Sequence, residues 1–220
     1  MNVNLDGYGR AYYPNNYKGG ALLHLCNAGK IYLPDGSSYQ GSESNATCVG
    51  RFMHDFKRIG DAGWQDSSVG VIDWYGILGE GATTIHGRKV KSVKPVLQKD
   101  GSGFYVSPTS LVDTKITDMA DQNRYVNPLR ISSAVVPSSF VSRGIAIGTF
   151  GVAIDKNKRI TIPFVVGDGG PRVGEGSASL ARLVAGKPVT DQLTHETACV
   201  GQVDKADVLW GLLWRPGNYV

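Results

Sequence analysis

Glycine is unusually frequent in this chain. It accounts for 29 of the 220 residues, about 13% where ~7% is typical. Proline is ordinary at 10, and the glycines follow no three-residue period, which excludes a collagen-like chain. So many glycines favour tight turns between short strands, and 41% hydrophobic residues suffice for a buried core. The composition therefore predicts a β-rich fold, and the length predicts a single domain, residues 1–220.

Short β-type runs alternate with turn residues along the chain. The clearest case is the pair 148–154 and 159–166, which flank the polar turn 155–158. This pattern predicts a hairpin in which Asn157 takes the positive φ of the turn. The second strand is expected to end at Gly167–Asp168.

Two segments have helical periodicity. Apolar residues recur at three- and four-residue steps over 45–60, with Ser44 or Asn45 as the N-cap. A second helix is predicted over 176–184, closed by Gly186. Strands before, between and after two helices of modest length indicate an α+β fold with few helices.

Charge and hydropathy exclude several function classes. The formal net charge is 23 − 19 = +4, spread along the chain, which is too weak for a nucleic-acid groove. The longest apolar run, Ile145–Ile154, contains two glycines and is too short to insert into a membrane. The start, Met1–Asp6, has no basic or apolar segment of a signal peptide, so the chain is either cytosolic or exported by a signal outside it.

Three cysteines are present, Cys26, Cys48 and Cys199. They form no CxxC motif, and no two histidines lie three to five residues apart, so no metal site is predicted. One disulfide with one cysteine left over is expected. The short loop between Cys26 and Cys48 favours that pair, and the other pairings stay open.

The segment 164–182 carries the most chemistry. It places Asp168 and Glu175 seven residues apart, with glycines that let a sugar approach the backbone. Hydrolysis of a glycosidic bond needs two carboxyl groups on opposite sides of that bond. The alternative is structural, since an Asp in a turn and a Glu at a helix N-terminus are also typical caps.

The phrase Val166-Gly-Asp-Gly-Gly-Pro, followed by Gly174-Glu-Gly-Ser-Ala-Ser-Leu-Ala-Arg, resembles the signature of glycoside hydrolase family 75, the fungal-type chitosanases and their bacterial relatives. Compatible phrases, among them Leu5-Asp-Gly-Tyr-Gly-Arg and Gly103-Phe-Tyr-Val-Ser-Pro-Thr-Ser-Leu, extend the resemblance over about residues 6–186. The resemblance implies an inverting, endo-acting hydrolase of β-1,4-linked amino-sugar polymers that needs no cofactor. Asp168 and Glu175 match its catalytic pair.

The resemblance also bears on architecture. The strand, the Gly-Asp-x-Gly turn and the following helix resemble the catalytic corner of cell-wall-active double-psi barrels, so the expected fold is a six-stranded double-psi-like β-barrel. Residues from about 34 to 70 match no phrase of the family and are expected to be an insertion.

Six further residues are candidates for substrate binding. An aspartate binds sugar amines or hydroxyls, aromatic rings stack on pyranose faces, and arginines bind carboxylates. The candidates are Asp6, Arg10, Tyr12, Tyr105, Ser107 and Arg172.

The polymer is predicted from charge. Chitosan is a polycation, whereas peptidoglycan carries carboxylates, which suit a +4 protein better. A muramidase is therefore favoured over a chitosanase, with a secreted or periplasmic site of action. A rival of another class is a non-catalytic wall-binding or wall-loosening module. The expected partner is the amino-sugar polysaccharide, not nucleic acid, with an inhibitor or immunity protein added if the chain is a toxin.

Overall fold

The computed structural model describes residues 1–12, 25–41 and 44–213. They fall into two compact units. Unit 1 comprises Met1–Tyr8, Thr109–Thr117 and the residues from Asn123 onward, and unit 2 comprises Gly9–Pro108 and Asp118–Gln122. The α+β, strand-rich fold class predicted from the sequence is confirmed. That the chain is one domain stays a prediction.

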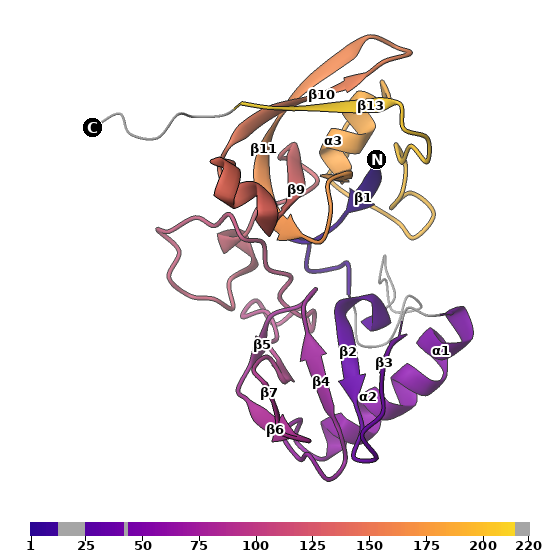
Figure 1. Ribbon diagram of the computed structural model, residues 1–220, viewed down its shortest axis with the longest axis vertical. Coiled ribbons are helices and arrows are strands. Elements are labelled where there is room, and N and C mark those ends of the chain that lie inside the picture. Colours follow the sequence, from indigo (N-terminus) through magenta and orange to yellow (C-terminus); the bar gives the residue numbers. More distant parts are fainter. Residues whose placement is uncertain (13–24, 42–43, 214–220) are drawn as a thin grey trace. The chain divides into compact units, whose positions relative to one another are not determined.

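Unit 1 is built on a six-stranded sheet (Figure 1). Its strands are β1 (Asn2–Asn4), β9 (Ser133–Pro137), β10 (Phe150–Asp155), β11 (Ile160–Gly170), β12 (Glu175–Ser177) and β13 (Val208–Leu212). The spatial order is β1-β12-β9-β11-β10-β13. The pairs β1–β12 and β9–β11 are parallel, and the other neighbours are antiparallel. Among the described residues, β1 and β13 do not pair, so this sheet is open.

One face of this sheet is covered by the helix α3 (Ala178–Val184). Leu180 and Val184 pack there against alternate residues of β9 and β11, such as Ala134 and Val166. The sheet curls around this core. A Cβ placed on Gly176 would lie 3.1 Å from the Met1 sulfur and 3.4 Å from the Trp210 ring, although these two residues come from opposite ends of the sheet order.

Ser177 ties α3 to the sheet. Its Oγ accepts hydrogen bonds from the N–H groups of Leu180 (3.2 Å) and Ser133 (3.0 Å) and donates to the Ile131 carbonyl (2.9 Å). The side chain is 2% exposed, so its partners have no water to replace it.

We expect Ser177→Ala to lower the free energy of unfolding by about 2 kcal/mol, because a buried helix cap and two further, partly buried hydrogen bonds are lost. Urea unfolding measures this. Ser44→Ala is the matched control, since Ser44 caps α1 (Asn45–Val49) at an exposed position. An equal loss in both variants would contradict the role given to Ser177.

Unit 2 has a three-stranded sheet in the order β3-β2-β4 and two small two-stranded sheets, β5-β8 and β6-β7. The strands are β2 (Gly29–Tyr32), β3 (Ser38–Gln40), β4 (Val71–Trp74), β5 (Gly79–Glu80), β6 (Thr83–Ile85), β7 (Arg88–Val90) and β8 (Lys94–Pro95). The helices are α1 and α2 (Arg51–Asp61). Short 3-10 turns occur at η2 (Leu25–Ala28) in unit 2, at η4 (Gln122–Arg124), where the chain passes from unit 2 to unit 1, and at η5 (Ser138–Arg143) in unit 1.

Both faces of the β3-β2-β4 sheet are packed. On one face, Phe52 and Phe56 of α2 make edge contacts with Trp74, with ring centroids 6.3 and 6.1 Å apart. On the other face, Val71 packs with Val90 of the β6–β7 hairpin. Residues 34–70, the expected insertion, thus supply α1, α2 and β3 to this unit, and their status as an insertion stays a prediction.

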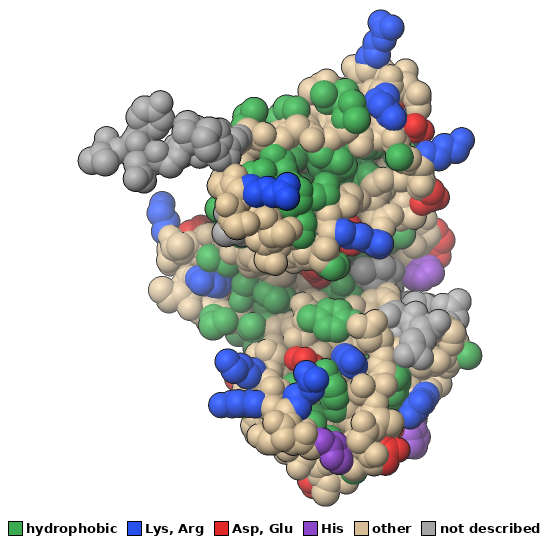
Figure 2. All heavy atoms as spheres, viewed as in Figure 1, with side chains coloured by type: hydrophobic (Ala, Val, Ile, Leu, Met, Phe, Trp, Pro, Cys, Tyr) green, Lys and Arg blue, Asp and Glu red, His purple; other side chains and the backbone are tan. Residues whose placement is uncertain are grey.

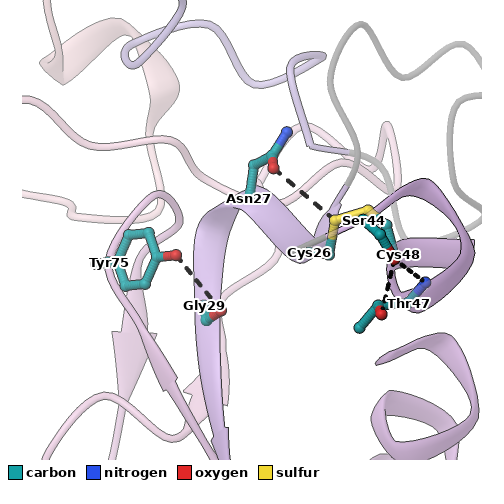
Figure 3. Close-up of a disulfide and its surroundings, with 7 residues drawn as sticks. All are labelled: Cys26, Asn27, Gly29, Ser44, Thr47, Cys48 and Tyr75. Atoms are coloured by element: carbon teal, nitrogen blue, oxygen red, sulfur yellow. Dashed lines mark hydrogen bonds between the residues drawn. A yellow bond between two sulfur atoms is a disulfide. The ribbon is translucent and has the colours of Figure 1, made fainter. Parts of the chain in front are cut away.

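A disulfide joins Cys26 and Cys48, with 5.4 Å between their Cα atoms. It links η2 to α1, as Figure 3 shows. Cys199 is free and exposed. The pairing favoured by loop length is therefore confirmed.

Several predicted elements are corrected in detail. The predicted helix over 45–60 is two helices, because Gly50 has φ −97° and ψ −92°, outside the helical region. The hairpin at 150–170 is confirmed, but Arg159 (φ 57°), not Asn157, has the positive φ. Its second strand continues to Gly170 instead of ending at Asp168. No helix among the described residues is long and apolar enough to span a bilayer.

Candidate active site

The side chain of Asp168 is aimed by a bulge in β11. Val166 pairs with Ala134 and Asp168 pairs with Val135, so Gly167 is the extra residue between them. Val166 faces the core, and regular alternation would bury Asp168 there too. The extra residue shifts the alternation of side chains between the two faces by one position, so the Asp168 side chain lies on the face opposite the core.

Glu175 reaches the same face from the other side of β9. Gly176 pairs with Ala134 in an antiparallel register, which sets Glu175 opposite Val135. Gly176 and Ala134 face the core, so Glu175 and Val135 point away from it. Asp168 and Glu175 therefore lie in one row across the sheet, on either side of Val135. Two strand spacings separate their backbones by about 9.5 Å.

Asp168 is held by a neighbouring loop. Its Oδ1 accepts hydrogen bonds from the Ser110 N–H (3.0 Å), the Ser110 hydroxyl (2.5 Å) and the Gly169 N–H (2.8 Å). The loop is fixed in turn, because the Leu111 N–H donates to the carbonyl of Gly167 (2.8 Å). Among the described residues, Oδ2 has no hydrogen-bond partner, so hydrogen bonds anchor only one of the two carboxylate oxygens.

Glu175 is partly buried, with 23% of its side chain accessible. Its Oε1 lies 4.0 Å from Nε of Arg172, which is 71% exposed. An ion pair this long and exposed contributes little to stability. Glu175 belongs to β12 and not to a helix start, and the cap of α3 is Ser177. The capping alternative for Glu175 is therefore wrong.

Two of the predicted substrate contacts belong to the same unit. Arg172 lies in the turn between β11 and β12, beside Glu175. Asp6 follows β1, and its carboxylate accepts a hydrogen bond from the Asn4 amide (3.1 Å). Asn4 pairs with Ser177, two positions along from the pairing of Asn2 with Glu175. Strand alternation thus places Asn4 on the face that carries Glu175.

The other four candidates, Arg10, Tyr12, Tyr105 and Ser107, lie in unit 2. Tyr12 is 6% exposed and Tyr105 is 7% exposed, which leaves their rings little surface for stacking on a sugar. Ser107 is 1% exposed and donates to the Gly76 carbonyl (3.2 Å). Arg10 lies over the Phe104 ring, 5.3 Å from its centroid. Their part in substrate binding stays a prediction.

Burial raises the pKa of Tyr105 to about 12. The folded protein therefore holds this proton more tightly than the unfolded chain, in which a tyrosine titrates near pH 10. We expect the stabilisation to be complete below about pH 10 and to be lost as the pH rises towards about 12. Urea unfolding at about pH 9 and 11 should show a smaller alkaline loss for Tyr105→Phe than for wild type. An unchanged loss would place the titration elsewhere.

Sequence reasoning missed Ser110 and the bulge at Gly167. Ser110 lies in the phrase Gly103–Leu111 that resembles the hydrolase family, yet its spacing from Asp168 gives no sign of contact. Within residues 1–12, 25–41 and 44–213, no three His, Cys, Asp or Glu side chains gather in a group that could hold a metal ion.

Comparison of the chain with protein-family models finds no match, and comparison with curated proteins finds none either.

Proposed function

We propose that the chain is an inverting, endo-acting glycoside hydrolase of a β-1,4-linked amino-sugar polymer. The observation that carries the proposal is the placement of Asp168 and Glu175 in one row, on either side of Val135, on the face of the sheet opposite the core. Inverting enzymes separate their two carboxyl groups by about 6.5–9.5 Å so that a water fits beside the base. A backbone separation of about 9.5 Å lets two carboxyl groups on the same face meet that requirement.

In the proposed mechanism, Asp168 is the base and Glu175 the acid. The three donors on Oδ1 hold the Asp168 carboxylate in place and leave Oδ2 to take a proton from water. The water attacks the anomeric carbon, and the glycosidic C–O bond breaks. Glu175 gives its proton to the departing oxygen, so the cycle ends with the two carboxyl groups in exchanged protonation states. Exchange with solvent restores them.

Ser110 is a positioning residue in this scheme, because it acts only through Asp168. We expect Ser110→Ala to lower kcat about tenfold with KM nearly unchanged, since a hydrogen bond to a charged group is worth about 1.5 kcal/mol or more. Ser110→Thr keeps the hydroxyl and should recover most of the loss. Initial rates over a range of substrate concentrations separate kcat from KM. An equal loss in both variants would assign Ser110 a purely structural role.

For unit 1 we propose a double-psi-like barrel. Six strands with two parallel pairs support it, as does the curl that brings Met1 and Trp210 to the same core. The position of Asp168 at the bulge of β11 supports it too, as does the direct passage of the chain from β12 into α3. We include in the same proposal that the chain is a member of glycoside hydrolase family 75, which its sequence resembles.

For the polymer we propose a peptidoglycan-type glycan, with chitosan as the alternative. Arg172 beside Glu175 supports a substrate that carries carboxylates. The Cys26–Cys48 disulfide supports action in an oxidising compartment, outside the cytosol. Incubation with purified sacculi, chitosan and chitin, followed by assay of new reducing ends, tests the proposal. New ends from sacculi alone are expected, and ends from chitosan alone would make the protein a chitosanase.

A further inference from the structure

A basic and aromatic surface lies on unit 2, on the face of the β3-β2-β4 sheet that is turned away from α2. Lys30 pairs with Asp73, and Tyr32 follows Lys30 by two residues, so these side chains share a face. Trp74 is on the opposite face, where it meets Phe52 of α2.

Two cations converge on one ring at this surface. Lys30 and Arg88 each lie over Tyr32, 5.2 Å from the ring centroid. Arg88 is brought there by the β6–β7 hairpin, whose turn contains His86 (φ 47°) and Gly87 (φ 74°), the positive values of a tight hairpin turn. In the described part of the chain neither cation forms an ion pair with an acid. The contacts with the Tyr32 ring thus position both charges at this surface, beside Asp73.

An acceptor and an exposed ring lie beside the cations. Asp73 is half-buried, and burial raises its pKa while the charges of Arg88 and Lys30 lower it. Tyr75 is 54% exposed, and its hydroxyl donates to the Gly29 carbonyl (3.4 Å), which fixes the ring (Figure 3). We call Lys30, Tyr32, Asp73, Tyr75 and Arg88 the basic–aromatic patch. Figure 2 shows basic, acidic and hydrophobic side chains together on this face of unit 2.

We propose that the basic–aromatic patch binds an acidic glycan, a strand of neutral amino sugars with carboxylates at intervals. The cations take a carboxylate, Asp73 accepts hydrogen bonds from hydroxyl or acetamido groups, and the Tyr75 ring stacks on a sugar face. A nucleic acid carries a phosphate on every unit and would bring one against Asp73. The choice of a wall glycan rests on the proposed function, although the patch belongs to unit 2 and the two catalytic carboxylates belong to unit 1.

The test uses the full-length Glu175→Gln protein, so that binding is measured without cleavage. Co-sedimentation with purified sacculi gives a dissociation constant, with insoluble chitin as the neutral probe. We expect tighter binding to sacculi than to chitin, weakened about tenfold by Lys30→Ala and by Arg88→Ala, each added to Glu175→Gln. Lys57→Ala is the matched control, because Lys57 is an exposed lysine of α2, on the opposite side of the sheet.

Unchanged binding in the Lys30→Ala and Arg88→Ala proteins would overturn the proposal. So would tighter binding to single-stranded poly-dT than to sacculi, which would make the patch a nucleic-acid site. Failure of the proposed function is seen separately, as an absence of new reducing ends from the wild-type protein whether or not it sediments with sacculi.

Discussion

Asp168→Asn and Glu175→Gln are each expected to lower kcat by about 10²–10⁴-fold, the usual worth of general acid or base catalysis. Both amides keep the shape of the side chain and lose only the proton transfer. The amide of the Asp168→Asn variant would retain an oxygen for the Ser110 donors, so the loop beside the bulge should stay in place. Folding is therefore expected to be intact, which circular dichroism and urea unfolding check.

The controls are Asp191→Asn and Glu196→Gln, the same chemical changes at exposed positions of unit 1. They should leave the release of reducing ends unchanged. Near-full activity in either Asp168→Asn or Glu175→Gln would assign the chemistry to another carboxylate. The next candidate is Asp6, which follows the end of β1 by two residues.

Loss of the disulfide is the second large effect. The Cys26–Cys48 bond closes a loop with a sequence separation of 22, and a crosslink of that size stabilises by about 3 kcal/mol through the lost freedom of the unfolded chain. We expect the double variant Cys26→Ser, Cys48→Ser to lose about that much in unfolding free energy. Both sulfurs are in buried residues, so the new hydroxyl groups should add to the loss.

Tryptophan fluorescence during urea unfolding measures this effect, because Trp74 is buried beside α2 and the partly buried Trp64 packs against it. Cys199→Ser is the control, since Cys199 is free and exposed, and it should leave the midpoint unchanged. A midpoint in the double variant equal to that of wild type would contradict the stabilising role of the crosslink.

Local patterns predicted local structure well. The 150–170 hairpin, the positions of the helices and the disulfide all follow from residues close together in sequence. The break at Gly50 was missed because the apolar period continues through it, from Val49 to Phe52. The apolar period predicts which face of a helix is buried. It does not show where a single residue leaves the helical conformation.

The geometry of the candidate site depends on pairing between segments far apart in the sequence. Asp168 and Glu175 lie in one row, on either side of Val135, because β9 lies between β11 and β12. A run such as Val165-Val-Gly-Asp does not show which of its side chains face the core. One extra residue in the strand moves every side chain that follows to the other face of the sheet. The pairing of β11 with β9 determines which face each side chain takes after the bulge. That pairing joins strands that are distant in the sequence, so it cannot be read from either strand alone. Ser110, 58 residues from Asp168, was hidden for the same reason.

The stereochemistry of the first product tests the central claim most directly. Proton NMR of sacculi-derived glycan strands, recorded during the first minutes of cleavage by the wild-type protein, distinguishes the two anomers of the new reducing end. Two carboxyl groups two strands apart predict inversion, so the α-anomer should form first from the β-linkage, with Glu175→Gln giving neither anomer. Initial formation of the β-anomer, or no new reducing end at all, would contradict the account.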